Sequence, residues 1–490
     1  MTPTIHTLRL IARVFFRRVE VTGLEHIPAT GGGLLISWHP NALIDPGLIL
    51  THFPRRIVFG ARHGLFQWPL LGWVMRRLGT VPIYRGQDRQ AGDPDTERQA
   101  ANAQSLDALA QGVVEGSFAA LFPEGLSHDE PYPQELKTGA ARLFYRACEL
   151  TPEGNASPVI IPVGLHYDKK SVFGSSALVA FHPPLELDPE LATPPSPGDS
   201  YEDARKKYRL LTSEFERVLH EIVHATESWE VHQLLHRGRK LVRAERAHRA
   251  GASLDRPGME ERQLGFARLW KGYRALLQTH PRKVEELFAH VKDYDRDLRT
   301  LGIHDHELDG VSHLRSLGVA GILFLQWILA YLLLPPILIV GYVANIPTAL
   351  LVAAVSKGAV RANKDAASVK LIFGAVAFPL TWLVIAVLVS RGFSVLHTIY
   401  PTIPNAPFLT GFIAFALSAL GGLVAVHYIR LAQQTFRSFG VRLTRARRSD
   451  AITRLRAQRS ELYERMMAMS KGIELPGVAA VDGRVTLDID

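Results

Sequence analysis

The chain has 490 residues, and its 56 Lys and Arg against 47 Asp and Glu give a formal net charge of +9. A hydrophobic share of 47% and a charged share of 21% exclude wholesale disorder, collagen-like repetition and a chain made only of membrane spans. The single cysteine, Cys148, excludes a disulfide framework and a cysteine-rich zinc module, and the length predicts about three domains.

The first residues predict an amphipathic helix over residues 1–18. Apolar side chains share one helical face and arginines surround them: Leu8, Leu10, Ile11, Val14 and Phe15 on the face, with Arg9, Arg13, Arg17 and Arg18 around it. This composition is typical of a helix in a membrane interface, and a helix that covers a protein core has the same pattern. Because basic residues interrupt the apolar stretch and no small-residue cleavage site follows, we expect no cleavable signal peptide.

Residues 19–200 have the pattern of an α/β domain with a buried sheet. Short apolar runs recur along the segment: GGLLIS, RRIVFGA, TVPIY, FAALF, VIIPVGLHY and ALVAF. Two stretches with helical spacing, residues 96–114 and 136–150, separate the later runs. The turn cluster TPPSPGDS closes this segment, and residues 201–315 then read as helices rich in Arg, His and Glu.

Residues 316–430 are almost free of charge and predict a transmembrane region. Four windows carry no charge at all: residues 317–334, 337–355, 371–390 and 406–426. Since about 20 apolar residues cross a bilayer, the last two windows predict transmembrane helices. The first two windows are separated by Pro335 and Pro336, and they fit two short spans, a re-entrant hairpin or one long kinked helix.

The charges beside these windows predict the topology. The loop after the first pair carries four cations (Lys357, Arg361, Lys364 and Lys370), and residues 430–471 are also strongly basic. Because positive loops stay in the cytoplasm, we expect the first pair to cross an even number of times, as a helical hairpin does. The catalytic region and both termini would then be cytoplasmic, with residues 431–490 as a basic tail containing one helix. In a bacterium the membrane would be the inner, or plasma, membrane. Lipid headgroups are nearer anions for these cations than nucleic acid, so we expect no nucleic-acid partner.

The first candidate site follows the apolar strand LLIS, in the segment Ser37-Trp38-His39-Pro40-Asn41-Ala42-Leu43-Ile44-Asp45-Pro46. A histidine can take a proton from a hydroxyl when a carboxylate fixes its tautomer, and Asp45 is the nearest carboxylate to His39. On a straight helix the two would point about 120° apart, so the pair requires a bend, which Pro40 can supply. A solvent-facing histidine beside a helix-capping aspartate has the same spacing.

Three more clusters end or interrupt apolar strands. Arg85 closes the run GTVPIYR, where its guanidinium could bind phosphate with two hydrogen bonds. In FPEGLS, Gly125 allows a close approach of the backbone to a ligand, and Glu124 and Ser127 offer an acceptor and a donor for a polyol.

Lys137 enters a predicted helix whose first amides could help to hold an anion. Pro162 lies inside the strand VIIPVG, where a proline usually marks an edge or a bulge. Taken singly, each of these clusters also fits an ordinary turn or strand end.

In this order and spacing the four clusters resemble the glycerophospholipid acyltransferase family, which includes glycerol-3-phosphate and lysophosphatidate acyltransferases. The resemblance covers about residues 19–190: a His…Asp box, a Gly…Arg box, FPEG followed by Ser, and an apolar strand containing Pro. HPNALIDP, FPEGLSHDEP and LKTGAARL are most similar to the branch of fungal-type glycerol-3-phosphate and dihydroxyacetone-phosphate acyltransferases, whose catalytic domain is also followed by membrane helices. Trp38 replaces the usual Asn, and His39 and Asp45 are one residue further apart than in the common box.

The resemblance implies an α/β acyltransferase domain, a mixed sheet flanked by helices, followed by a helical region and a C-terminal all-α transmembrane region. It implies that His39 is the general base and that Asp45 orients it. The implied substrate-binding residues are Arg85, Glu124, Gly125, Ser127, Lys137 and Pro162.

The implied reaction moves a fatty acyl group from acyl-CoA, or from acyl carrier protein, to a hydroxyl of glycerol-3-phosphate or dihydroxyacetone phosphate. It requires no cofactor and no metal, and the sequence contains neither a G-x-S-x-G elbow nor a Walker loop. Two alternatives remain open: an acyltransferase that acts on lysophosphatidate or another lysophospholipid, and an inactive lipid-binding membrane scaffold.

Overall fold

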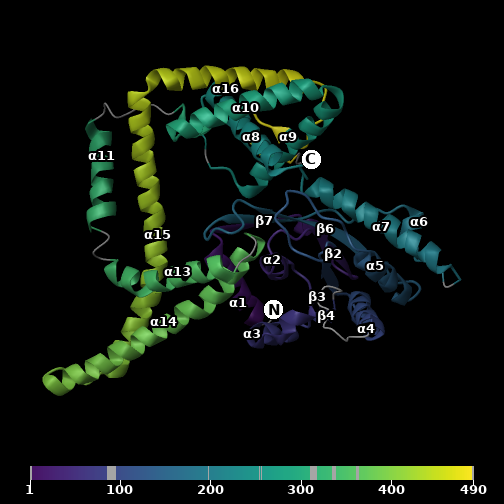
Figure 1. The fold of residues 1–490 in the computed structure, drawn as a ribbon, viewed down its shortest axis with the longest axis horizontal. Coiled ribbons are helices and arrows are strands. Elements are labelled where there is room, and N and C mark those ends of the chain that lie inside the picture. The colour runs from purple at the N-terminus through teal and green to yellow at the C-terminus, as the bar shows by residue number, and fades with distance from the viewer. Residues whose placement is uncertain are drawn as a thin grey trace. The chain divides into compact units, whose positions relative to one another are not determined.

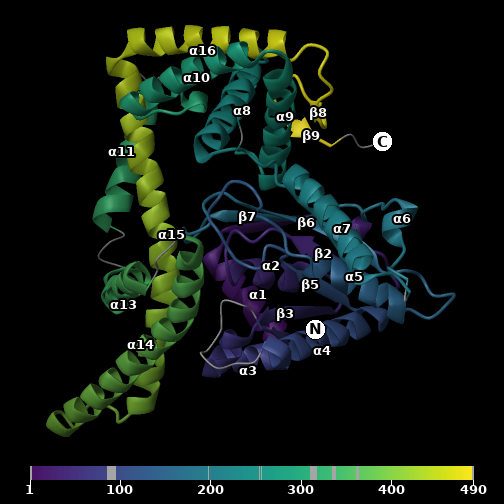
Figure 2. The same ribbon diagram turned by 45° about the vertical axis from the view of Figure 1, so that its right-hand side comes forward.

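The structure, a computed structural model, describes residues 3–84, 95–196, 198–252, 254, 256–309, 317–333, 338–359 and 363–487 (Figures 1 and 2). The chain divides into two compact units, which we call the sheet unit and the helical unit. The sheet unit comprises Met1–His232, Gly258–Gln263 and Ala362–Ser368, and the helical unit comprises Gln233–Pro257, Leu264–Arg361 and Val369–Asp490.

The sheet unit is built on a seven-stranded mixed sheet with the strand order β1-β7-β6-β2-β5-β3-β4. The strands are β1 (Arg18–Thr22), β2 (Gly33–Ser37), β3 (Ile57–Arg62), β4 (Val81–Ile83), β5 (Phe118–Leu121), β6 (Val159–Tyr167) and β7 (Ser176–Phe181). All neighbouring strands are parallel except β6 and β7, which pair antiparallel. The carboxyl ends of β2, β5 and β6 therefore meet at one edge of the sheet, which is where ligands bind in folds of this kind.

Helices flank the sheet. They are α1 (Pro3–Phe15), α2 (Ile44–His52), α3 (Pro69–Arg77), α4 (Asp95–Val114), α5 (Gly139–Leu150), α6 (Pro189–Ala192) and α7 (Tyr201–Ile222), with short 3₁₀ turns η1 (Leu24–His26) and η2 (His63–Gln67). Side chains of α4, α5 and α7 form one core with Leu34 and Ile36 of β2. After α2, the ring of Phe53 contacts those of Phe118 and Phe181 at centroid distances of 4.9 and 5.5 Å. The expected mixed sheet flanked by helices is thus present.

The sheet unit continues beyond the turn at residues 193–200. Helix α7 contributes Leu211, Phe215 and Leu219 to the core on the sheet, and all three are fully buried. Burial of each such side chain stabilises the fold by roughly 2 kcal/mol, so α7 is part of this unit, which extends to His232. From sequence alone, α7 could not be told from the helices that follow it.

The helical unit contains most of α8 (Trp229–Arg249) and α9 (Met259–Thr279), whose first turns lie in the sheet unit. It also contains α10 (Pro281–Leu301), the 3₁₀ turn η4 (Asp305–Glu307), α16 (Ser449–Met469) and the short pair β8 (Val478–Ala479) and β9 (Val485–Thr486). Apolar residues of α8, α10 and α16 share one core, which includes Leu241, Leu298 and Leu462. Helix α16 lies within residues 431–490.

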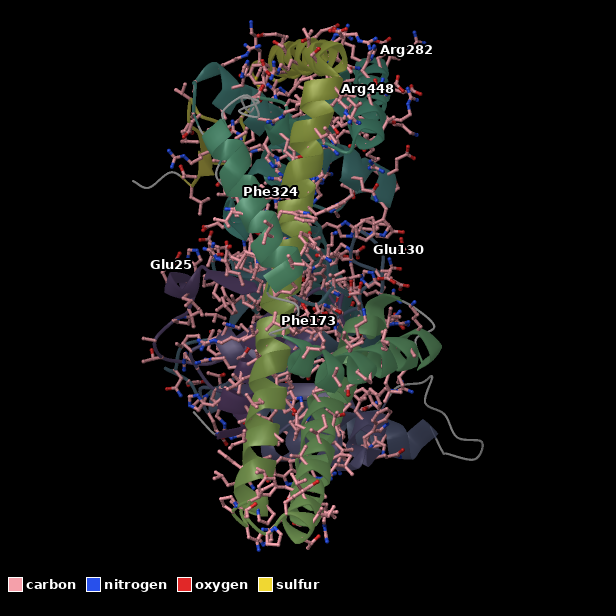
Figure 3. All side chains as sticks on the ribbon, turned by 90° about the vertical axis from the view of Figure 1, so that its left-hand side faces the viewer. Glu25, Glu130, Phe173, Arg282, Phe324 and Arg448 are labelled. Carbon is pink, nitrogen blue, oxygen red and sulfur yellow. The ribbon has the colours of Figure 1, made fainter. Side chains whose placement is uncertain are left out.

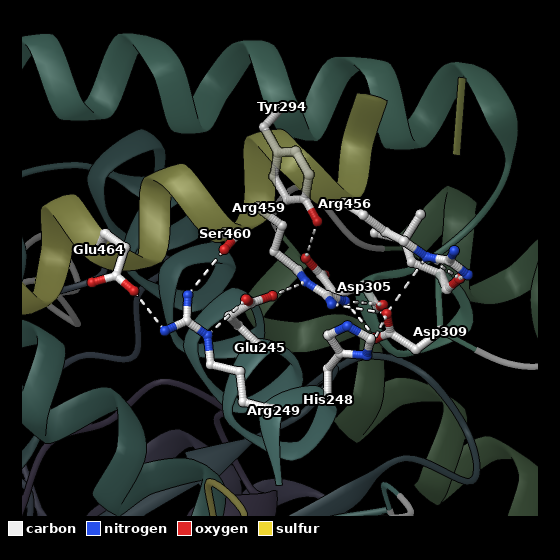
Figure 4. Close-up of polar contacts among 11 residues, drawn as sticks. Glu245, His248, Arg249, Tyr294, Asp305, Asp309, Arg456, Arg459, Ser460 and Glu464 are labelled. Carbon is white, nitrogen blue, oxygen red and sulfur yellow. Dashed lines mark hydrogen bonds and ion pairs between the residues drawn. The ribbon is translucent and has the colours of Figure 1, made fainter. Parts of the chain in front are cut away.

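A buried ionic network links α16 to α8 and to the segment after η4 (Figure 4). The side chain of Arg459 on α16 is fully buried. Its Nε lies 2.8 Å from Glu245 Oε2, and its Nη1 lies 2.6 Å from Asp309 Oδ2. Tyr294 of α10 donates a hydrogen bond of 2.9 Å to Asp305 Oδ1, beside the same network. Arg249 also contacts Glu245, and Arg456 also contacts Asp309, but Arg459 is the fully buried cation that joins the two carboxylates, so α16 is part of the core of this unit.

Between α10 and α16 the chain forms long apolar helices: α11 (Leu317–Ile328), a π-helical turn (Leu329–Leu333), α13 (Ile339–Ala359), α14 (Asn363–Ile399) and α15 (Pro407–Arg447). Within the described residues, two segments are long and apolar enough to cross a membrane: Ser368–Ile399, with a mean hydropathy of 2.5, and Pro407–Ala425, with 2.0. They contain nearly all of the windows 371–390 and 406–426. Large apolar side chains are exposed on these helices and on α11, where Phe324 is an example (Figure 3).

The described parts of the first two uncharged windows are mostly helical as well, and the double proline Pro335-Pro336 lies outside the described residues. Helix α13 packs closely on α15, where an added Cβ at Gly341 would lie 2.6 Å from the carbonyl oxygen of Gly421. Asn345 donates to the carbonyl oxygens of Gly341 and Ser418 and accepts from Trp382 Nε1, each at 2.9 Å. Small residues and such polar contacts are typical of helix packing in membranes.

Candidate active site

His39 and Asp45 are brought together by a sharp turn between β2 and α2. His39 lies two residues after the end of β2, and Asp45 lies in the first turn of α2. The distance from His39 Nδ1 to Asp45 Oδ2 is 2.8 Å, and the same oxygen accepts a 2.7 Å hydrogen bond from the backbone N–H of Asn41. The turn needs more than Pro40, because Ala42 adopts a left-handed conformation with a φ of +40°.

The imidazole of His39 is fixed by a ring contact and by its hydrogen bond to Asp45. Its ring stacks on that of Phe122 at a centroid distance of 4.1 Å and an interplanar angle of 17°. A neutral imidazole that donates from Nδ1 to Asp45 presents an acceptor lone pair at Nε2. Among the described residues no group forms a hydrogen bond with Nε2, and 14% of the side chain is exposed. This nitrogen can therefore accept a proton from a bound hydroxyl.

The second oxygen of Asp45 is bound by Tyr167, a residue that sequence reasoning did not single out. The Tyr167 hydroxyl, at the end of β6, donates a hydrogen bond to Asp45 Oδ1. Burial and the neighbouring carboxylate raise the pKa of Tyr167 well above its ordinary value, although the Asn41 side chain acts in the opposite direction. Tyr167 is thus a protonated donor at neutral pH.

Glu124 binds the protein's own donors in this structure. Its side chain is buried, and Oε2 accepts a 2.8 Å hydrogen bond from the backbone N–H of His39. Oε1 accepts from His128 Nε2 at 2.8 Å and from the backbone N–H of Gln134 at 2.9 Å. These contacts fix the FPEG loop to the turn between β2 and α2, while the predicted contact of Glu124 with substrate stays a prediction.

Two further residues outside the predicted set anchor the turn. Trp38, which replaces the usual Asn, donates from Nε1 to the carbonyl oxygen of Leu165 on β6 at 2.9 Å. Lys170 Nζ donates to the carbonyl oxygens of Pro40 and His128 at 3.0 and 3.3 Å and lies 2.5 Å from Asp129 Oδ1. Lys170 follows β6 by three residues, so its position after a strand was the signal available in the sequence.

Two of the other predicted site residues, Gly125 and Lys137, lie beside each other in the structure. Gly125 has a left-handed φ of +71°, and an added Cβ would lie 3.9 Å from the Cγ of Lys137. Lys137 precedes α5, is exposed, and its Nζ is 3.7 Å from Glu135 Oε2. Ser127 follows in the same loop as Glu124. Arg85 lies outside the described residues.

Pro162 departs from the expected edge or bulge. It lies in β6, an interior strand, and the register with β2 runs without interruption through the pair Ile36–Pro162. Pairing with β7 begins only at Val163, so the missing N–H of Pro162 removes no regular ladder bond on that side. Within the described residues no group of three or more His, Cys, Asp or Glu side chains is arranged to hold a metal ion.

Comparison with known proteins gives a consistent family. The family model described as Acyltransferase matches residues 18–166. The chain is 26% identical over 189 residues to glycerol-3-phosphate O-acyltransferase 2 of Saccharomyces cerevisiae, which covers 38% of this chain and 23% of the yeast protein. It is 25% identical over 280 residues to glycerol-3-phosphate O-acyltransferase 1 of the same yeast, covering 55% of this chain and 35% of that protein.

A bacterial relative is matched over more of its length. Lyso-ornithine lipid O-acyltransferase of Rhodobacter capsulatus is 26% identical over 209 residues, which are 38% of this chain and 68% of that protein. The crystal structure of the 1-acyl-sn-glycerophosphate acyltransferase from Thermotoga maritima is 18% identical and covers 44% of this chain and 79% of that one, with a TM-score of 0.29. Residues 18–166 thus match an acyltransferase domain, and these similarities support the glycerophospholipid acyltransferase family for this part of the chain.

Proposed function

We propose that the protein is a membrane-bound O-acyltransferase that moves a fatty acyl group from a thioester to a hydroxyl of glycerol-3-phosphate or dihydroxyacetone phosphate. The observation that carries this proposal is the His39–Asp45 pair, with Nδ1 held at 2.8 Å from the carboxylate and Nε2 available. The names of the two yeast relatives support this choice of acceptor, although the chain matches only 23% and 35% of their lengths.

The reaction follows from this geometry. His39 Nε2 accepts the proton of the acceptor hydroxyl while its oxygen attacks the thioester carbonyl carbon. The tetrahedral intermediate then expels the thiolate, the new ester bond remains, and the imidazolium returns its proton to the thiolate. Asp45 stabilises the imidazolium in between, so the chemistry needs neither a cofactor nor a metal.

The donor is acyl-CoA or acyl carrier protein in this proposal. The acceptor phosphate would bind Arg85 and Lys137, of which Lys137 is exposed beside Gly125. Guanidinium and ammonium groups are the usual protein partners of phosphate.

A second candidate is acyl transfer to a lysophospholipid. The match to a lyso-ornithine lipid O-acyltransferase, over 68% of that protein, favours it. Both candidates use the same base, so they differ only in what binds beside His39.

We further propose that the protein is an integral membrane protein with its catalytic domain and both termini in the cytoplasm. The two apolar segments in α14 and α15 support membrane attachment. The shared core of α10 and α16 supports an even number of crossings, because these helices precede and follow the apolar stretch in the chain. Lys357, Arg445 and Arg447 near the ends of α13 and α15 fit the cytoplasmic side.

The test is acyl transfer by membranes that contain the wild type, His39→Ala or His290→Ala, where His290 is an exposed histidine on α10. Labelled glycerol-3-phosphate is supplied with palmitoyl-CoA, and the lipid extract is analysed for lysophosphatidate. We expect product from the wild type and His290→Ala, and none from His39→Ala. Normal turnover by His39→Ala would contradict the proposed base.

A parallel assay with lysophosphatidate and labelled palmitoyl-CoA ranks the two acceptors. Product only in this assay would favour the second candidate. If neither acceptor is acylated with acyl-CoA or acyl carrier protein as donor, while the protein still binds lipid, the protein is a lipid-binding scaffold and the proposal is wrong.

A further inference from the structure

We infer that Tyr167 is a positioning residue, whose hydroxyl fixes the Asp45 carboxylate so that Oδ2 faces His39. The inference rests on the proposed acyl transfer for its kinetic consequence, and on the geometry of the buried carboxylate for its structural one. Nothing in the common sequence boxes points to this tyrosine, which lies 122 residues after Asp45.

The Asp45 carboxylate is fully buried, and its two oxygens accept hydrogen bonds from different donors. Oδ2 receives His39 Nδ1 and the N–H of Asn41, whereas Oδ1 receives the hydroxyl of Tyr167. A buried carboxylate needs such donors to remain ionised, and a donor on each oxygen also fixes the plane of the group. With Oδ1 bound, rotation of the carboxylate away from His39 would break a hydrogen bond.

Tyr167 is itself rigidly placed. It is the last residue of β6, where it pairs with Ala177 of β7. The ring of Phe16, which is buried after α1, stacks on the Tyr167 ring at a centroid distance of 6.1 Å and an interplanar angle of 30°. Strand pairing and ring stacking therefore hold the hydroxyl in place before any substrate binds.

Removing the Tyr167 hydroxyl should move the pH at which His39 becomes neutral in one predictable direction. Tyr167 draws negative charge toward Oδ1, so without it more charge remains on Oδ2, next to the imidazole. The protonated form of His39 would then be favoured, and the neutral base would appear only at higher pH. A purely structural loosening would weaken the contact of His39 with Asp45 and move the protonation curve in the opposite direction.

The experiment compares Tyr167→Phe with Tyr145→Phe. Tyr145 is also buried, and its hydroxyl donates a 2.9 Å hydrogen bond to the carbonyl oxygen of Leu191, far in sequence from the catalytic turn. Diethyl pyrocarbonate modifies neutral imidazoles, and mass spectrometry of the peptide containing His39 measures its modification rate against pH without any turnover. In Tyr167→Phe we expect the midpoint to move to higher pH by roughly half a unit to one unit, and in Tyr145→Phe we expect no movement.

Kinetics and a double variant complete the test. We expect kcat of Tyr167→Phe to fall about tenfold, with KM for the acceptor unchanged, since the lost hydrogen bond orients the base and not the substrate. The double variant Asp45→Asn with Tyr167→Phe should have the same midpoint of His39 modification against pH as Asp45→Asn alone.

A midpoint in Tyr167→Phe that equals that of Tyr145→Phe, or that moves to lower pH, would overturn the inference. Absence of turnover in the wild type would instead contradict the proposed function. The chemical modification curves still decide the role of Tyr167 in that case, so the two failures are distinguishable.

Discussion

Ala42 is a strained residue in the turn that joins His39 to Asp45. Its φ of +40° lies in the left-handed region, which costs an L-residue roughly 1 kcal/mol and costs glycine much less. We expect Ala42→Gly to raise the free energy of unfolding by up to about 1 kcal/mol, so that its melting temperature equals or exceeds that of the wild type. We expect Ala42→Val to melt at a lower temperature, because a β-branched side chain tolerates this conformation poorly. Thermal unfolding in detergent measures both, and equal melting temperatures for the two variants would contradict the strain.

At the same scale, Glu124→Gln separates a positioning role from substrate binding. Both carboxylate oxygens accept N–H groups, from His39 on one side and from His128 and Gln134 on the other. An amide NH2 in place of one oxygen would face a donor, which costs about 1–3 kcal/mol in a buried site. We expect kcat to fall by at least about tenfold with KM for the acceptor little changed. A rise in KM with kcat preserved would show that Glu124 mainly binds the acceptor.

At the scale of the elements, four histidines of the sheet unit lie close to one another. They are His166 in β6, His182 just after β7, His224 just after α7 and His232 in the first turn of α8. Burial lowers the pKa of His182 to about 4, of His224 to about 3 and of His232 to about 4, and it lowers that of His166 well below its ordinary value. The rings of His166 and His224 are 6.3 Å apart, and Nε2 of His182 has no hydrogen-bond partner among the described residues.

These histidines should make the sheet unit sensitive to acid. In the folded chain these imidazoles are neutral, whereas in the unfolded chain they titrate near pH 6.5, so the unfolded state binds more protons between about pH 6.5 and 4. We expect the free energy of unfolding to fall as the pH falls through that window, and His182→Gln to reduce the dependence. Unfolding midpoints between pH 7 and 5 test this, with His290→Gln as the exposed control. An unchanged slope in His182→Gln would rule out a contribution from His182.

At the scale of the whole molecule, much of the fold and part of the candidate site could be predicted from the sequence. Parallel strands bring their carboxyl ends to one edge, so polar residues that follow apolar runs, such as His39 and Glu124, could be placed together. Tyr167 and Lys170 end or follow the apolar run of β6 in the same way, but the sequence does not show that this run pairs with β2, more than 100 residues earlier in the chain. The position of α7 could not be predicted either, since the apolar face of an amphipathic helix does not indicate which surface it packs on.

The proposed topology is a prediction at this scale. In a background with Cys148→Ser, a cysteine at the exposed Thr402, between α14 and α15, should react with a membrane-impermeant maleimide in intact cells. A cysteine at Val481, which is 83% exposed near the C-terminus, should react only after the membrane is opened. The reason is that Thr402 follows one apolar segment and Val481 follows both. Labelling of both positions from outside would contradict a cytoplasmic C-terminus.

The ionic network around Arg459 has a consequence for how the protein is made. Glu245 and Asp309 leave the ribosome before the apolar helices, and Arg459 leaves it after them. If the apolar stretch enters a membrane as proposed, its insertion begins while the core of α8 and α10 still lacks α16. This core is therefore completed only at the end of translation, and until then Glu245 and Asp309 lack the buried arginine that joins them, although each already has a partner on α8.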